Sequence, residues 1–209
     1  MQSLNRLKSE RPRRAYDFYE TPIGLVKASL NRFCSDENDP RLFTSLDAGA
    51  GNGVWGLGYR QTIPYDDCLF GIEMQDIRKP FPLSNVYDVW ADNQDYLDYT
   101  SDNDLFGLIF GNPPYSLAEE FVRHSMKLVS DNGYVYFLFR LAFLESKKRI
   151  PLYKDYPPKR VYVLQRRPSF FSANGKTRTT DATSYAMFLW QKGWKGQTEL
   201  DWLYWEYDK

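Results

Sequence analysis

The feature that most constrains the fold of this chain is an apolar run that ends in two prolines. Residues 105–110 read Leu-Phe-Gly-Leu-Ile-Phe, which is typical of a buried β-strand, and Gly-Asn-Pro-Pro-Tyr follows. The strand must end there, because a proline cannot donate to a β-ladder and fixes its own φ. Ser116 and Glu119 have the spacing of a capping box, which predicts that a helix begins next. The sequence therefore predicts a rigid tetrapeptide, Asn112 to Tyr115, at the carboxyl end of a strand, where open α/β sheets bind ligands.

This tetrapeptide suits one chemical task, which is to make a poor nitrogen nucleophile react. An NH2 group on a conjugated ring or carbonyl attacks slowly. The side-chain oxygen of Asn112 and the carbonyl of Pro113 can both accept hydrogen bonds from that group and stabilise the positive charge that develops on it. Pro113 and Pro114 hold these acceptors in place, and Tyr115 offers a flat face on which a ring can stack. The alternative interpretation is a Pro-Pro turn that ends a strand beside a capping Asn.

A glycine-rich turn follows an earlier predicted strand. Residues 47–53 read Asp-Ala-Gly-Ala-Gly-Asn-Gly, between a strand predicted over 44–47 and a helix predicted from Val54. Gly49 and Gly51 let the backbone pass close under a ligand and leave amide groups free to bind it. Asp47 could order the loop or accept from a ligand ammonium. The spacing differs from the dinucleotide-binding G-x-G-x-x-G, and no Lys-Ser/Thr follows as in a phosphate-binding loop.

Acidic residues end the next two predicted strands. A strand over 68–72 ends in Glu73, at nearly the spacing from Gly51 that a ribose-binding acid has. A strand over 86–90 leads to Asp92, which could accept from an adenine amino group. The alternative is that both acids are ordinary solvated carboxylates.

The segment before the glycine-rich turn reads Asp-Phe-Tyr-Glu-Thr-Pro at residues 17–22. Thr21 is predicted to be the N-cap and Pro22 the first residue of a helix that continues through Phe33. The amino end of this helix is a natural place for a carboxylate. Further elements are predicted as a helix over 117–129 and strands over 133–139, 161–164 and 184–190.

Taken in their order along the chain, the motifs resemble those of AdoMet-dependent amino methyltransferases, most closely the DNA adenine-N6 methyltransferases of bacteria and phages. The resemblance covers roughly residues 16–193. It implies a Rossmann-like α/β fold of the class I AdoMet-dependent methyltransferases, with a seven-stranded, mostly parallel sheet and an antiparallel last strand. It also implies that S-adenosyl-L-methionine is the cofactor and that a methyl group is transferred to the N6 of adenine in DNA.

The resemblance also implies a role for each matched residue. The catalytic residues would be Asn112, Pro113, Pro114 and Tyr115. The cofactor-binding residues would be Tyr19, Thr21, Pro22, Asp47, Gly49, Gly51, Glu73, Asp92 and Asn112. The substrate-binding residues would be Tyr115, Phe170, Phe171, Lys176 and Arg178. Phe170 and Phe171 are candidates for the far wall of the base pocket, and the alternative for both is simple burial.

Charge is segregated along the chain although the formal net charge is zero. Residues 1–14 carry five basic residues against one acid, and residues 140–178 carry eleven against two. Such segregation favours a nucleic-acid partner, most readily DNA. We expect a flexible basic arm over 1–14 and a single domain over 15–209, with no room for a separate target-recognition domain. Sequence specificity would then come from short loops, from the arm or from a partner subunit.

Several classes of protein are disfavoured. Cys34 and Cys68 lie far apart and His124 is the single histidine, so no metal-ligand spacing exists and no metal is expected. No apolar run approaches membrane-spanning length and no signal peptide is evident, so no membrane partner is expected. We therefore expect a cytoplasmic protein of a bacterium or of a phage-infected host cell.

Four alternatives to a DNA adenine-N6 enzyme share part of the pattern. RNA adenine-N6 and protein glutamine-N5 methyltransferases also use Asn-Pro-Pro-aromatic, and cytosine-N4 enzymes usually begin the tetrapeptide with Ser. A non-catalytic AdoMet-binding subunit is the fourth, and the intact tetrapeptide weighs against it. The Asp-Phe-Tyr-Glu-Thr-Pro element favours DNA over RNA and protein.

Overall fold

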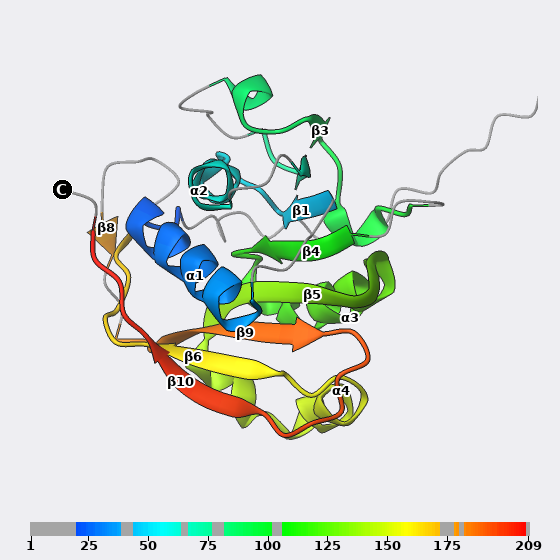
Figure 1. Ribbon diagram of the computed structural model, residues 1–209, viewed down its shortest axis with the longest axis vertical. Coiled ribbons are helices and arrows are strands. Elements are labelled where there is room, and N and C mark those ends of the chain that lie inside the picture. Colours follow the sequence, from blue (N-terminus) through cyan, green and yellow to red (C-terminus); the bar gives the residue numbers. More distant parts are fainter. Residues whose placement is uncertain are drawn as a thin grey trace, which may run out of the picture.

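The core of the structure is a twisted sheet with helices on both faces (Figure 1). The computed structural model describes residues 20–38, 44–63, 67–76, 82–101, 106–171, 178–179 and 182–207. The strand order of the eight-stranded sheet is β10-β6-β9-β5-β4-β1-β2-β3. Its strands are β1 (Thr44–Ala48), β2 (Cys68–Glu73), β3 (Val89–Asp92), β4 (Phe106–Gly111), β5 (Val129–Arg140), β6 (Arg160–Leu164), β9 (Tyr185–Gln191) and β10 (Glu199–Leu203). A separate pair is formed by β7 (Phe170–Phe171) and β8 (Arg178–Thr179).

Helices and short 3-10 turns connect these strands. The α-helices are α1 (Ile23–Asp36), α2 (Val54–Thr62), α3 (Ala118–Leu128) and α4 (Ile150–Asp155). The 3-10 turns are η1 (Leu83–Asn85), η2 (Tyr96–Asp98), η3 (Tyr115–Leu117), η4 (Leu141–Glu145) and η5 (Lys147–Arg149). None of the described helices combines the length and the apolar composition that crossing a bilayer requires.

The sheet confirms the predicted mostly parallel fold with an antiparallel strand. β1 pairs in parallel with β2 and β4, while β9 runs antiparallel between β5 and β6. The strand β10 was not predicted, and it pairs in parallel with β6 at the edge of the sheet. The antiparallel strand is therefore not the last one. β10 buries Leu203 but exposes Leu200 and Trp202, so its apolar residues do not form the continuous run that marks a central strand.

The central strand β4 divides its side chains between the two cores. Leu108 and Phe110 join the cluster beneath α1 and α2, while Phe106 and Ile109 join the cluster beneath α3. Because helices cover both faces, the strand is apolar throughout instead of alternating with polar residues.

Three local predictions were wrong. The predicted capping box does not form: Ser116 lies in η3, Glu119 lies in the first turn of α3, and Leu117 is the N-cap of that helix. Pro22, and not Thr21, is the N-cap of α1, and it forms no side-chain cap. The third strand begins at Val89, since Val86 ends η1 and Tyr87 is buried beneath the sheet edge.

Candidate functional site

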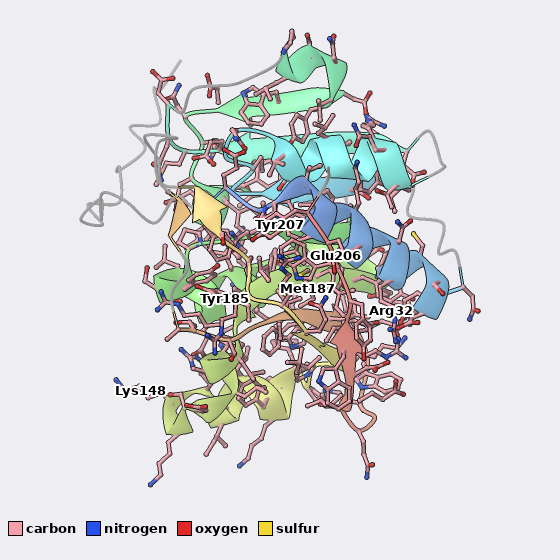
Figure 2. The ribbon with its side chains drawn as sticks, turned by 90° about the vertical axis from the view of Figure 1, so that its left-hand side faces the viewer. Arg32, Lys148, Tyr185, Met187, Glu206 and Tyr207 are labelled. Atoms are coloured by element: carbon pink, nitrogen blue, oxygen red, sulfur yellow. The ribbon has the colours of Figure 1, made fainter. Side chains whose placement is uncertain are left out.

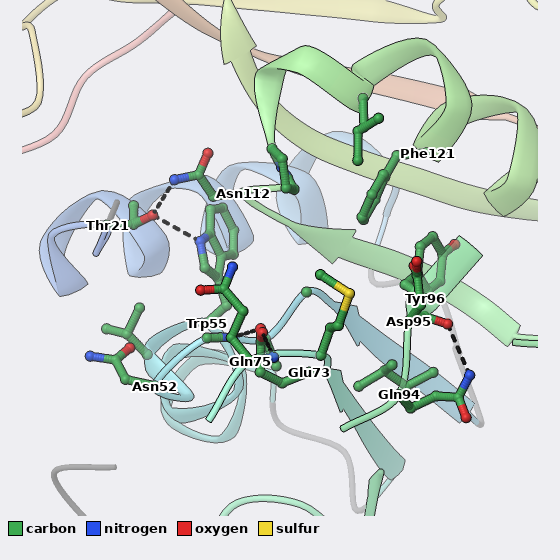
Figure 3. A pocket seen from close by; sticks show the side chains of 18 of the residues that line it. Thr21, Asn52, Trp55, Glu73, Gln75, Gln94, Asp95, Tyr96, Asn112 and Phe121 are labelled. Carbon is green, nitrogen blue, oxygen red and sulfur yellow. Dashed lines mark hydrogen bonds between the residues drawn. The ribbon is translucent and has the colours of Figure 1, made fainter. Parts of the chain in front are cut away.

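A cavity opens at the carboxyl ends of the central strands (Figure 3). Its walls come from the glycine-rich turn, the amino end of α2, the end of β2, the η2 turn and the tetrapeptide. The residues that line it are 20–21, 49–52, 54–55, 72–75, 94–96, 112, 114, 117 and 121. The parallel register explains the meeting of these segments, because Asp47 lies beside Gly71 and Phe110, and each strand then ends at the same edge.

The glycine-rich turn has the geometry that only glycine adopts without strain. Gly49, Gly51 and Gly53 have φ values of +70°, +59° and +88°. The amide of Ala50 donates to the carbonyl of Ile72 at 2.9 Å, which fixes the turn against β2. Residues 49–52 line the cavity.

Glu73 lies in the cavity wall and is held by both of its oxygens. Oε2 accepts from the amide of Gly51 at 2.8 Å and Oε1 accepts from the amide of Gln75 at 2.7 Å. Burial raises the pKa of this carboxyl above its ordinary value. A carboxylate has about four acceptor positions, so Glu73 keeps the capacity to accept further hydrogen bonds from a ligand.

Asp47 lies beneath the turn and does not line the cavity. Its carboxylate Oδ2 accepts from the amide of Gly56 at 3.1 Å and from the Tyr87 hydroxyl at 2.6 Å. These two partners belong to α2, the helix that follows the loop, and to the segment before β3. The side chain is fully buried, and burial raises its pKa from 3.8 to about 7.

The raised pKa of Asp47 predicts a stability change with pH. The folded protein binds the proton more tightly than the unfolded chain does, so this carboxyl destabilises the fold as pH rises from 3.8 toward about 7. The full effect is about 4 kcal/mol for a change of this size. Urea unfolding of wild type and Asp47→Asn across this range measures it: the wild-type free energy of unfolding should fall relative to that of the variant. If the free energy of unfolding of wild type minus that of Asp47→Asn stays constant or rises with pH, the raised pKa of Asp47 is wrong.

Asp92 and Asp95 occupy different places. Asp92 ends β3 beside Glu73, but it is exposed and does not line the cavity. Asp95, three residues further on, does line it, and its Oδ1 accepts from the amide of Leu97 at 2.9 Å. The ring of Tyr96 packs on Phe121 with centroids 4.8 Å apart, which holds this turn in place. Asp95 was not predicted from the sequence. An Asp that can accept from the amide two residues later is typical of a turn, and this pattern could have indicated it.

Thr21, which precedes α1, is hydrogen-bonded both to α2 and to the tetrapeptide (Figure 3). Its Oγ1 accepts from Trp55 Nε1 at 3.0 Å and from Asn112 Nδ2 at 3.2 Å. The amide nitrogen of Asn112 is thus directed to Thr21, and Asn112 itself lines the cavity. Gly111 has a φ of +143°, and a Cβ there would lie 3.1 Å from the carbonyl of Ala48, so only glycine brings Asn112 this close to β1.

Aromatic rings lie on the other side of the tetrapeptide. The ring of Tyr115 lies 5.8 Å from that of Tyr185, which lies 5.1 Å from Phe170. The guanidinium carbon of Arg140 lies 5.2 Å from the centre of the Tyr115 ring. Phe170 is buried in this cluster. Sequence reasoning did not single out Tyr185 or Arg140, which meet here because they are paired across β5 and β9.

Several predicted site residues complete this account. Six of them line the cavity: Thr21, Gly49, Gly51, Glu73, Asn112 and Pro114. Pro22 and Pro113 are buried and are adjacent in sequence to residues that line it. The backbone of Phe171 pairs with that of Arg178 in the β7–β8 pair. Tyr19, Lys176, the arm over 1–14 and the side chains of Phe171 and Arg178 lie outside the described residues. The cavity also contains residues that were not predicted, namely Glu20, Asn52, Trp55, Asp95, Tyr96 and Phe121.

The side chains do not suggest a metal centre. In the described part of the chain, no three His, Cys, Asp or Glu side chains are grouped closely enough to hold an ion. His124 packs edge-on against Tyr96, with ring centroids 5.0 Å apart.

No protein-family model matches the sequence, and no curated protein matches it either. Solved structures do match. A protein of Listeria monocytogenes assigned as a class I S-adenosylmethionine-dependent methyltransferase superposes with a TM-score of 0.62 and 14% identity, over 86% of this chain and 64% of that one. The methyltransferase subunit of a type I restriction-modification system from Streptococcus thermophilus gives 0.61 and 19%, over 84% and 45%. A protein of Pyrococcus horikoshii assigned as an RNA methyltransferase gives 0.60 and 14%, over 88% and 91%.

These likenesses concern the arrangement of the sheet and its helices. The chain spans less than two thirds of the length of the first two proteins, 64% and 45%. The mostly parallel sheet with the antiparallel β9 is thus an α/β fold shared with structures assigned as class I S-adenosylmethionine-dependent methyltransferases.

Proposed function

We propose that this chain transfers the methyl group of AdoMet to the exocyclic N6 of adenine in DNA. The observation that carries the proposal is the place of Asn112, which lines the cavity while its Nδ2 donates to Thr21, and the proposal assigns its side-chain oxygen to the target amino group. That oxygen belongs to an Asn-Pro-Pro-Tyr sequence at the end of a central strand. A fixed acceptor of this kind matches an amino group that becomes positively charged as it attacks.

The residues around the cavity fit AdoMet. Glu73 would accept from the ribose hydroxyls, and Asp95, which lines the cavity, would accept from the adenine amino group in the role first considered for Asp92. The amides of Gly49 to Asn52 and the amino end of α1 would face the methionine portion. AdoMet supplies an electrophilic methyl group when bound, and the Listeria neighbour is named for its dependence on it.

The protein contributes orientation and charge stabilisation. The side-chain oxygen of Asn112 and the carbonyl of Pro113 would accept from the target amino group, orient it and stabilise the positive charge that develops on its nitrogen. Tyr115 stacks on the target ring, which is extruded from a duplex or taken from a single strand. No covalent bond to the protein forms, so neither a Cys nor a His nucleophile is required.

Nucleic acid as the substrate is supported by charge and by two neighbours. Residues 140–178 carry eleven basic residues against two acids, and two of the matched structures are a restriction-modification methyltransferase subunit and a protein assigned to RNA. We propose that Lys176, Arg178 and the arm over 1–14 contact phosphates, and that a partner subunit or short loops select the sequence. Residues 15–209 would form the single methyltransferase domain.

A methyl-transfer assay tests the proposed reaction. Tritiated AdoMet is incubated with the protein and, in parallel, with double-stranded DNA, single-stranded DNA, RNA and a protein extract. Label is expected in DNA, and digestion to nucleosides should identify N6-methyladenine by mass spectrometry. Label in RNA or on glutamine side chains would assign the corresponding alternative, and no label in any acceptor would favour a non-catalytic subunit.

The basic arm should add affinity that does not depend on DNA sequence. Replacing Arg11, Arg13 and Arg14 together by alanine should weaken binding similarly for every DNA sequence. It should flatten the slope of log K against log salt by up to about three units if all three touch phosphates. Fluorescence anisotropy across a salt series measures the slope, and AdoMet affinity serves as the control because it should not change. An unchanged slope would mean that the arm is only a solubilising tail.

A further inference from the structure

Tyr115 lines a second cavity and does not line the first one. The second cavity measures about 370 Å³ and is lined by Tyr115, Ser116 and Ala118, by Phe139 and Arg140 at the end of β5, and by Ala142, Phe143 and Arg149. Tyr115 belongs to the tetrapeptide, so the second cavity is adjacent to the proposed methyl-transfer site.

The charge in this cavity is entirely positive. Of the side chains that line it in the described part of the chain, two are arginines and none is acidic. Arg149 has no carboxylate at ion-pair distance among the described residues. The surrounding segment 140–155 carries five basic residues and two acids. A positive cavity of this kind selects an anion.

Both guanidinium groups are held against rings. Arg140 lies over Tyr115 at 5.2 Å, and Arg149 lies over Phe143 at 4.5 Å while its Nη1 donates to the carbonyl of Phe143 at 2.9 Å. The Tyr153 hydroxyl donates to the same carbonyl, so this wall is fixed from two sides. Guanidinium groups that are already oriented lose little entropy on binding, and their planar fork matches the oxygens of a phosphate.

We propose that this cavity binds a phosphodiester group of the nucleic-acid strand, next to the nucleotide whose base stacks on Tyr115. The proposal rests on the proposed function, because it takes its substrate to be a nucleic acid. Tyr115 would link the two sites. The target ring would stack on Tyr115 in the proposed reaction, and Tyr115 also lines the cavity that contains Arg140 and Arg149. A strand that places its base on Tyr115 must carry its own backbone within one nucleotide of that ring. The arginine pair would anchor this backbone and fix how deeply the base enters.

The test compares cavity arginines with a lysine outside the cavity. Binding of a fluorescein-labelled oligonucleotide is measured by anisotropy across a salt series for wild type, Arg140→Gln, Arg149→Gln and Lys148→Gln. Lys148 is exposed on the same segment, projects away from the protein in Figure 2 and does not line the cavity. Each arginine variant should lose about tenfold in affinity. Each should also flatten the salt slope by about one unit. Lys148→Gln should change neither quantity, and all variants should retain AdoMet affinity.

A lysine replacement separates the effect of the charge from that of the guanidinium group. Arg140→Lys keeps the charge at an exposed position, so it should recover the salt slope while it recovers only part of the affinity. Unchanged slopes in both glutamine variants of a protein that still methylates oligonucleotides would overturn the phosphate site and leave the proposed function intact. Binding of inorganic phosphate that depends on Arg140, without any effect on oligonucleotide affinity, would assign the cavity to free phosphate and also overturn it. Methyl transfer to protein and to no oligonucleotide would overturn both proposals.

Discussion

Asn112→Ala is expected to lower the turnover number for methyl transfer at least about a hundredfold, the order of loss when one group that stabilises the transition state is removed. AdoMet affinity should stay nearly intact. The reason is that the side-chain oxygen acts on the charge that develops on the target nitrogen, which exists only during the reaction. Single-turnover rates with tritiated AdoMet and calorimetric AdoMet titrations measure the two quantities separately.

Two control variants show whether the loss belongs to the acceptor oxygen. Asn112→Ala also removes the hydrogen bond from Nδ2 to Thr21, which is worth about 1 kcal/mol. Thr21→Val removes the same hydrogen bond, together with the one from Trp55 Nε1, but leaves the Asn112 oxygen, and should therefore reduce turnover much less. Asn85→Ala changes an exposed Asn in η1, outside the cavity, and should have no effect on turnover. Near-normal turnover of Asn112→Ala would remove Asn112 from its role.

The second large effect concerns Glu73. Glu73→Ala should weaken AdoMet binding by about 1.5–3 kcal/mol, the range for a hydrogen bond to a charged group. The structure adds a second reason, because the same change removes the acceptors of the Gly51 and Gln75 amides and loosens the turn that lines the cavity. Isothermal titration calorimetry with AdoMet measures the loss.

Glu73→Gln divides this effect into its parts. The amide keeps one oxygen acceptor and the shape of the side chain, so its affinity should lie between those of wild type and Glu73→Ala. Glu120→Ala, at an exposed position of α3 outside the cavity, is the matched control and should bind AdoMet as the wild type does. Unchanged affinity in a folded Glu73→Ala protein would mean that the ribose assignment is wrong.

The elements that could be predicted from sequence depend on local chemistry. The two prolines after Phe110 end a strand wherever it lies, and glycines at 49, 51 and 53 permit a turn with positive φ. Apolar runs that helices cover on both faces mark the central strands. These features were enough to predict the fold class and to bring Glu73, Gly51 and Asn112 to one edge of a sheet.

What only the tertiary structure decided depends on partners distant in sequence. Thr21 has the residue type of an N-cap, yet Trp55 and Asn112 take its hydroxyl, because α1 packs where their donors can reach it. Asp47 turns beneath the loop because the Tyr87 hydroxyl lies there, forty residues away along the chain. Neither contact leaves a local signal.

The same reason explains the remaining differences. Asp95 and not Asp92 lines the cavity because Tyr96 anchors its turn on Phe121 of α3. Arg140 reaches Tyr115 because antiparallel pairing sets it beside Tyr185. The sequence by itself determined which chemistry ends each strand, since the backbone preferences of proline and glycine act over a few residues. The packing of helices on the sheet decided which of those side chains face the same cavity, since that depends on contacts between segments that no local pattern records.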